Sequence, residues 1–121
     1  MQTMKTSTGE PRGFPANRGE IWLVNLDPLT VDESARSRLC VIVSPAEIHE
    51  HLRTIIVAPL KTDGCPAPFR PGLSFRGKQG LILLDQVRSL DKARLVRRMG
   101  AVSGRTLKRT LRILQDLFAE N

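Results

Sequence analysis

Short β-prone runs separated by glycine and proline are the feature that most limits how this chain can fold. They are rich in apolar and β-branched residues, and no βαβ alternation links them. This pattern predicts a small, strongly bent antiparallel barrel or sandwich. The predicted strands are residues 19–26, 38–44, 54–60, 69–75, 80–84, 86–90 and 95–102. One or two helical turns are expected at 45–52, a loop at 61–68 and a turn at 76–80. Pro59 is expected to place the end of its strand at an edge or bulge.

One long helix is predicted at the end of the chain, capped by Ser103 and running to about Glu120. Its apolar face, which should pack on the barrel, is formed by Leu107, Leu111, Leu114 and Phe118. Its opposite face is a basic ridge formed by Arg105, Lys108, Arg109 and Arg112. That ridge is either a binding surface or an ordinary solvated face.

The charge of the chain favours a polyanionic partner. Nineteen Lys and Arg oppose twelve Asp and Glu, and the excess is concentrated between residues 88 and 112. Such a one-sided surface is typical of a nucleic-acid footprint or of a docking face for an acidic protein segment. Tyrosine is absent and Trp22 is the only tryptophan, so a sheet of base-stacking aromatics is not expected.

The remaining composition indicates a single cytoplasmic domain whose cysteines are reduced. Residues 1–17 are polar and are expected to be a disordered extension, with the folded domain at 18–121. Cys40 lies in an apolar run and Cys65 in a loop, a usage that favours free thiols over a disulfide. No apolar segment is long enough to span a membrane.

A candidate site lies where a polar loop enters a buried strand. Glu33, Arg36 and Arg38 precede the apolar residues 39–43, so the Arg38 guanidinium is expected on rigid backbone at the mouth of a cleft. An arginine that merely ends a strand at the surface is the ordinary alternative. Two further junctions between strand and loop carry polar side chains, at Lys61, Thr62, Asp85, Gln86 and Arg88.

These residues suit RNA cleavage better than other hydrolytic chemistry. The sequence has no phosphate-binding glycine loop, no nucleophile elbow and no convincing set of metal ligands, so neither a metal nor a cofactor is expected. RNA supplies its own nucleophile, because its 2′-hydroxyl can attack the adjacent phosphodiester. The protein must then align the reacting groups, move two protons and neutralise the charged phosphorane.

Four motifs in order resemble the MazF/PemK (Kid) toxin family over residues 18–118. They are R-G-E-I-W-L-V-N-L-D-P, D-E-S-A-R-S-R-L-C-V-I-V-S-P, T-I-I-V-A-P-L and D-Q-V-R-S-L-D-K-A-R-L. The resemblance implies a small SH3-like barrel of the PemK/CcdB type with a C-terminal helix, working as a homodimer. It also implies a metal-independent mRNA interferase that cuts single-stranded RNA and leaves 2′,3′-cyclic phosphate and 5′-hydroxyl ends. The implied inhibitor is an antitoxin with an acidic C-terminal segment.

Carried over by position, the resemblance matches Arg38 to the family's catalytic arginine, Glu33 to its loop acid, and Asp85 and Gln86 to its D-Q pair. Arg38 and Glu33 are therefore expected to be catalytic. Residues expected to bind RNA are Arg36, Ser37, Asp85, Gln86 and Arg88. Glu33 could instead simply pair with an arginine. Asp85 could equally be a structural or dimer-interface carboxylate.

Two departures from the family pattern leave part of the mechanism open. Lys61 stands where the family usually has a catalytic Thr or Ser, and Thr62 follows it. Either Thr62 donates the hydroxyl or Lys61 stabilises the phosphorane, and Lys61 is preferred because an ammonium is the stronger partner of a dianion. Leu83 and Asp32 replace the Arg and His of Kid-type members, which favours an arginine-centred mechanism.

Two other functions are compatible with the same fold. A CcdB-like toxin would poison gyrase without catalysis, but this chain ends in F-A-E-N and not in the Trp-Gly-Ile tail such a toxin uses. A basic regulator would bind nucleic acid without cutting it. The sequence fixes neither the RNA motif that is cut nor the identity of the antitoxin.

Overall fold

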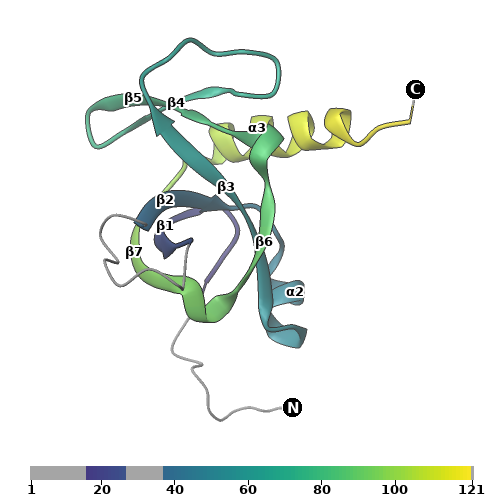
Figure 1. Cartoon of the computed structure of the whole chain (residues 1–121). Coiled ribbons are helices and arrows are strands. Elements are labelled where there is room, and N and C mark those ends of the chain that lie inside the picture. Colours follow the sequence, from purple (N-terminus) through teal and green to yellow (C-terminus); the bar gives the residue numbers. More distant parts are fainter. Residues whose placement is uncertain (1–15, 27–36, 121) are drawn as a thin grey trace.

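The computed structural model describes residues 16–26 and 37–120, which form a curled antiparallel sheet, a half-barrel, with helices at its margins (Figure 1). The strands are β1 (Glu20–Asn25), β2 (Ser37–Ile42), β3 (Thr54–Thr62), β4 (Gly72–Phe75), β5 (Lys78–Ile82), β6 (Arg88–Asp91) and β7 (Leu95–Ala101). The helices are α2 (Ala46–His51) and α3 (Gly104–Leu117), with single 3-10 turns η1 (Leu84–Gln86) and η2 (Lys92–Arg94). The predicted fold class is confirmed.

Strand β3 connects two parts of the sheet, whose order is β4-β5-β3-β2-β1-β7, with β6 also beside β3. Its first half pairs with β6 through Val57, and its last residues pair with β5 from Leu60 onward. Pro59 lies between these two ladders, so its missing N–H removes no hydrogen bond from either. The predicted edge or bulge at Pro59 is therefore wrong, because β3 lies inside the sheet and its ladders with β2, β5 and β6 show no register shift.

Two predicted boundaries near the site are also wrong. Strand β3 continues through Lys61 and Thr62, which were expected to begin a loop, because β5 offers them a pairing partner. The turn expected at 76–80 contains only Arg76 and Gly77, both with positive φ, and β5 begins directly after it at Lys78. Two central residues with positive φ form the tight turn that suits the right-handed twist of a hairpin.

The curled sheet buries an apolar cluster on each face. Inside the curl lie Ala16, Trp22, Val24, Cys40, Ile42, Ile55, Val57, Leu90 and Leu95. On the other face lie Ile21, Val41, Val43, Ala58, Ile82 and Leu84, covered by side chains of the β4–β5 hairpin and of α3. Strand β2 contributes alternately to both clusters, as the period of a strand requires.

A buried polar network fixes the start of the described chain to α2. The Nδ1 atom of His49 donates to the carbonyl oxygen of Ala16 at 3.0 Å, and its Nε2 atom accepts from the Ser44 hydroxyl at 2.6 Å. Ser44 Oγ also accepts from the backbone N–H of Ile56 at 2.9 Å. Because each buried polar atom has a partner, the network can form inside the body without a desolvation penalty.

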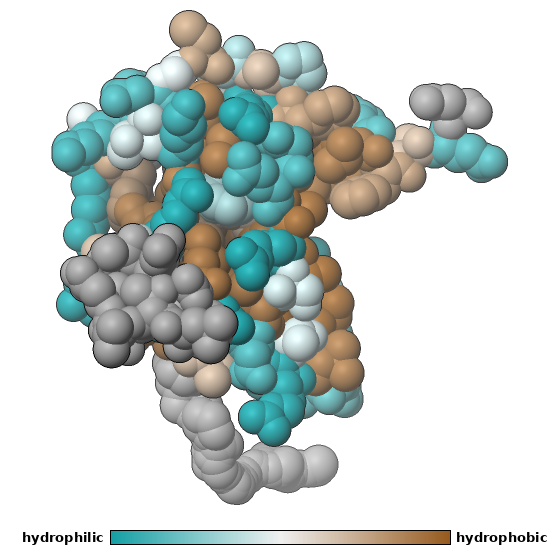
Figure 2. Space-filling model, viewed as in Figure 1, coloured by the Kyte–Doolittle hydropathy of each residue, from teal (hydrophilic) through white to brown (hydrophobic). Residues whose placement is uncertain are grey.

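Helix α3 begins as predicted, with the backbone N–H of Thr106 donating to Ser103 Oγ. Ile113 and Leu114 pack on the second cluster, but Phe118 is 73% exposed. The prediction that Phe118 packs on the barrel is therefore wrong, because the last turn of α3 projects beyond the sheet (Figure 1). Apolar residues remain visible along α3 and on the body below it (Figure 2). In residues 16–26 and 37–120, no helix has the length and apolar character needed to cross a membrane.

Candidate active site

The candidate site is a cavity that opens where β2 and β3 separate. These strands pair from Ile42–Val57 to Cys40–Pro59, and beyond that point β3 follows β5. The cavity between them has a volume of about 540 Å³. Its described lining comprises Ser37, Arg38, Leu39, Leu60, Lys61, Thr62, Leu73, Phe75, Arg76, Lys78, Gln79, Gly80 and Met99. Four of the predicted site residues, Ser37, Arg38, Lys61 and Thr62, are therefore brought together.

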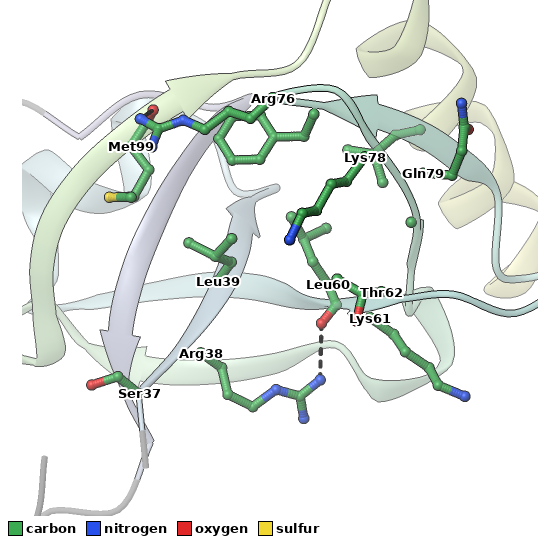
Figure 3. A pocket seen from close by; sticks show the side chains of 13 residues that line it. Ser37, Arg38, Leu39, Leu60, Lys61, Thr62, Arg76, Lys78, Gln79 and Met99 are labelled. Atoms are coloured by element: carbon green, nitrogen blue, oxygen red, sulfur yellow. Dashed lines mark hydrogen bonds between the residues drawn. The ribbon is translucent and has the colours of Figure 1, made fainter. Parts of the chain in front are cut away.

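Arg38 is fixed at the base of this cavity. Its Nη2 atom donates to the carbonyl oxygen of Leu60 at 2.9 Å, across the gap between the two strands (Figure 3). Its backbone is held in the sheet by pairing with Val24 of β1. A guanidinium has five N–H donors in a rigid fork, so this bond orients the group without using up its capacity to bind an anion.

Lys61 and Thr62 are the last two residues of β3 and form part of the cavity wall. They pair with Leu81 and Gly80 of β5. Both side chains are exposed. In Figure 3 the Lys61 side chain points away from the cavity, with its ammonium beyond the end of the strand. The backbone places the two residues side by side, but only a change of side-chain rotamer would bring the Lys61 ammonium over the cavity.

The β4–β5 hairpin forms the opposite wall and contributes residues that the sequence analysis missed. Arg76, with φ of 53°, donates from Nη2 to the carbonyl oxygen of Met99 at 2.7 Å, and its guanidinium lies over the Phe75 ring. The Phe75 ring also lies against Gly100 of β7, where an added Cβ would be only 2.8 Å from Cε1. These contacts fasten the hairpin to β7. The signal available in the sequence was F-R-G-K, a two-residue Arg-Gly turn followed directly by a lysine.

The cavity has the electrostatic character of an anion site with an apolar floor. Four cationic side chains line it, Arg38, Lys61, Arg76 and Lys78, and its described lining contains no carboxylate. Close cations facing a common space raise each other's energy unless an anion lies between them. Apolar side chains beside such a space can contact sugars or bases, while the cations contact phosphate.

Cys40 is buried two residues after Arg38 on β2 and cannot act as a nucleophile. Burial raises the pKa of its thiol to about 12, although the positive charges of Arg38 and Arg88 oppose the shift. The thiol is therefore neutral at physiological pH and behaves as a small apolar side chain. Both Cys40 and Cys65 are free, as predicted.

The other predicted RNA-binding residues lie outside the lining of the cavity. Asp85 and Gln86 form part of η1, and Asp85 accepts two hydrogen bonds at 2.8 Å from the guanidinium of Arg70. The hydrogen bonds from Arg70 hold the pKa of the Asp85 carboxyl below its ordinary value. Arg88 is exposed on β6, opposite Val57. Glu33 and Arg36 lie outside the described residues.

The basic segment 88–112 is divided by the fold into bonded and solvent-facing parts. Three of its cations donate hydrogen bonds to backbone carbonyl oxygens: Lys92 to His49, Arg94 to Leu26 and Arg109 to Gly72. A fourth, Arg98, forms an ion pair with the Glu20 carboxylate. The predicted ridge of Arg105, Lys108, Arg109 and Arg112 lines a second hollow of about 570 Å³ on α3. Across the described residues, no group of three or more His, Cys, Asp or Glu is placed to bind a metal ion.

Comparisons with known proteins agree with this geometry. The profile of the PemK-like, MazF-like toxin of type II toxin-antitoxin system matches residues 17–118. Endoribonuclease PemK from Escherichia coli is 37% identical over 91 residues, which cover 70% of this chain and 68% of that protein.

Solved structures show the same fold at lower identity. MazF from Deinococcus radiodurans has a TM-score of 0.70 at 23% identity, covering 86% of this chain and 96% of that one. A mycobacterial endoribonuclease in complex with its cognate antitoxin has a TM-score of 0.71 at 17% identity, covering 88% and 99%. At these identities the structural likeness establishes the fold alone.

Proposed function

We infer that this chain, which belongs to the PemK-like, MazF-like toxin family of type II toxin-antitoxin systems, is an endoribonuclease. We propose that it cuts single-stranded RNA at short sequences without a metal ion. The observation that supports this most is the cavity in which Arg38 is fixed by Leu60 and whose lining also includes further cations and apolar side chains. A phosphodiester with its flanking nucleosides has the complementary chemistry.

The proposed reaction is a transesterification within the RNA. The 2′-oxygen loses its proton and forms a bond to the adjacent phosphorus, while the bond from phosphorus to the 5′-oxygen breaks and that oxygen gains a proton. The products are a 2′,3′-cyclic phosphate and a 5′-hydroxyl. Arg38 binds the non-bridging oxygens, whose charge grows in the phosphorane, and its fixed position avoids reorganisation at that moment.

Glu33 and the pair Lys61 and Thr62 complete the proposed catalytic set. Glu33 is kept as the candidate carboxylate of the loop, although it lies outside the described residues. Thr62 has its hydroxyl on the cavity wall, whereas Lys61 needs to swing inward to reach the same space (Figure 3). Lys61 was preferred because its ammonium is the stronger partner of a dianion, but its outward orientation weakens that preference. Thr62 is therefore a comparable candidate for the role that a Thr or Ser has in the family.

RNA binding is proposed to extend beyond the cavity along exposed polar groups. Ser37 lines the cavity next to Arg38 in the chain, and Arg88 is exposed on β6, opposite Val57 of β3. Arg36 precedes Ser37 in the chain. Asp85 and Gln86 are further from this path, and the bonds from Arg70 favour a structural role for Asp85.

The proposed partners are an antitoxin and a second copy of this chain. A related mycobacterial endoribonuclease has been solved with its cognate antitoxin, and family membership extends that expectation to this chain. An acidic segment of the antitoxin would complement the net charge of +7. The exposed Phe118 and the half-buried apolar face of α3 support a homodimer, because an apolar surface of this kind is usually covered.

The experiment that tests the activity uses a single-stranded RNA of mixed sequence, incubated with purified protein in EDTA. The proposal predicts a few discrete cuts, a 2′,3′-cyclic phosphate on each upstream product and a 5′-hydroxyl on each downstream product. Replacing the nucleotide before the cut with its 2′-deoxy form should stop cleavage. Intact RNA at saturating protein, as expected of a regulator or a gyrase poison, would refute the proposal.

A further inference from the structure

Lys78 is the one labelled lysine in Figure 3 whose side chain reaches into the cavity. It begins β5, directly after the Arg76–Gly77 turn, and runs toward the side chains of Leu39 and Leu60. The next residue, Gln79, points away from the cavity in the same view. This difference follows from the strand itself, because successive side chains of β5 project to opposite faces.

Lys78 and Arg38 approach the same space from opposite walls. Arg38 lines the cavity from β2 with its guanidinium at the Leu60 carbonyl oxygen, and Lys78 reaches from the hairpin toward the side chains of Leu39 and Leu60 (Figure 3). Leu39 and Leu60 line the same cavity and provide an apolar surface that water solvates poorly. Two cations on either side of such a surface form a site for a single anion with oxygens directed both ways.

The hairpin that carries Lys78 is held in place and is not a free flap. Arg76 is bonded to the carbonyl oxygen of Met99, and the Phe75 ring is confined against Gly100. A non-glycine residue with φ of 53° at position 76 costs energy that these contacts offset. A cation positioned in this way stabilises a transition state better than one on a mobile segment, because its charge is already oriented.

We propose that Lys78 is a catalytic residue whose ammonium binds the scissile phosphate opposite Arg38. This inference rests on the proposed endoribonuclease activity and adds to it a cation that neither the motifs nor the family resemblance identified. When the 2′-oxygen attacks phosphorus, the non-bridging oxygens gain charge, and Lys78 and Arg38 each stabilise part of it. Lys78 transfers no proton in this scheme, so the bonds formed and broken are those of the reaction above.

The first test is the rate of RNA cleavage under single-turnover conditions in EDTA, with protein in saturating excess. Lys78→Met keeps the length of the side chain and removes its charge, and it should cut about 100-fold or more slowly. Lys78→Arg should lose no more than about tenfold, since it restores a cation. Ser74→Ala is the matched control, because Ser74 is exposed on the partner strand of the same hairpin and lies outside the described lining of the cavity, and it should cut at the wild-type rate. Circular dichroism and thermal unfolding establish that the variants are folded.

A second measurement separates catalysis from simple attraction of RNA. The dissociation constant for an uncleavable RNA with 2′-O-methyl groups should rise only a few-fold in Lys78→Met, about what one exposed phosphate contact contributes. A variant that binds this RNA more weakly but cuts at the wild-type rate when saturated would overturn the catalytic role.

A third measurement returns the charge chemically. Lys78→Cys in a Cys65→Ser background leaves Cys40 as the remaining other thiol, and Cys40 is buried and has a raised pKa of about 12. Treatment with 2-bromoethylamine then places an ammonium at position 78 at nearly the original distance from the backbone. The treated protein should cut at least about tenfold faster than untreated Lys78→Cys, because the substitution removed the cation and left the fold intact.

The outcomes separate this inference from the function on which it rests. Absence of cleavage by the wild-type protein would refute both. Cleavage by the wild type with an equal rate in Lys78→Met, or no recovery after aminoethylation, would refute the role of Lys78 alone. Slow cleavage in Lys78→Met together with near-normal binding and chemical rescue supports it.

Discussion

Arg38 donates to the carbonyl oxygen of Leu60 at 2.9 Å, just past the Cys40–Pro59 pair at which β2 and β3 cease to form a ladder. The bond bridges the two strands where they diverge and sets the guanidinium at the base of the cavity. Because Leu60 contributes a backbone atom, its identity can change without losing the bond. The position of Arg38 therefore depends on the departure of β3 toward β5, which brings the Leu60 carbonyl oxygen within reach.

Glu20 provides a pH-dependent part of the stability. Burial alone raises the pKa of its carboxyl, but hydrogen bonds from Trp22, Asn17 and Arg98 outweigh burial and leave the pKa below its ordinary value of 4.5. The unfolded chain then binds the proton more readily, so the contribution is complete above pH 4.5 and is lost as the pH falls through the folded value.

The variant Glu20→Gln should be less stable than the wild type by about 1–3 kcal/mol at neutral pH, since buried donors lose a charged acceptor. Urea unfolding at pH 7 and at pH 3 measures this difference, which should shrink at the lower pH. The exposed Glu50→Gln is the control and should change little at either pH. A Glu20→Gln deficit that is equal at both pH values would contradict the assignment.

Asp85 is tied to Arg70 and is not free to act as a base. In an NMR titration the pKa of the Asp85 carboxyl should lie below the ordinary aspartate value, and Arg70→Gln should raise it toward that value. The cleavage rates of Asp85→Asn and Arg70→Gln should also fall by similar factors, because each breaks the same pair. A much larger loss in Asp85→Asn than in Arg70→Gln would instead identify Asp85 as a catalytic base.

The two cysteines should differ in reactivity by a large factor. Cys65 is exposed, whereas Cys40 is fully buried with a pKa of about 12. At pH 8 a disulfide reagent such as DTNB should react with one thiol per folded chain and with two in urea. Cys65→Ser should abolish the reaction of the folded protein. Rapid labelling of Cys40 before unfolding would show that the β2 strand opens in the native state.

The exposed end of α3 should contribute to dimer formation. Phe118 is 73% exposed, and Figure 2 shows apolar residues along the same helix. Phe118→Glu should therefore shift the protein toward monomer in light scattering after gel filtration, because it buries a charge at the contact. Glu120→Gln, near the same end of the chain, is the control. A dimer of unchanged dissociation constant in Phe118→Glu would place the interface elsewhere.

The parts that follow from local pattern could be predicted from the sequence. The N-cap of α3 at Ser103 is confirmed, and Leu114 of the predicted apolar face packs on the second cluster, whereas Phe118 does not. The local pattern placed Arg38 at the mouth of a cleft, and it does line the cavity, but a surface arginine stayed the ordinary alternative until the family resemblance gave Arg38 an expected catalytic role. The helix cap and the start of the buried strand depend on residues a few positions apart, so the local pattern was sufficient for these.

The parts that depend on distant contacts could not be predicted. The extension of β3 through Thr62 depends on its pairing with β5, and the tie between Asp85 and Arg70 crosses fifteen positions. In the sequence Lys78 looks like an ordinary lysine in a turn. Its place in the cavity lining depends on how the β4–β5 hairpin packs against strands that are distant in the chain. A slip of one residue in strand register would move every following side chain to the other face, and the register of β5 is set by its pairing with β3 and β4.

The central claim is that Arg38 performs RNA cleavage from a fixed position in the cavity. Its most direct test is the single-turnover rate of cleavage of a single-stranded RNA in EDTA, compared between Arg38→Ala and the matched surface control Arg97→Ala. Arg97 is exposed on β7 and lies outside the described lining of the cavity. We predict a loss of at least about 1,000-fold in Arg38→Ala with an unchanged fold, and near wild-type rates in Arg97→Ala. Cleavage by Arg38→Ala at a rate close to wild type would contradict the account.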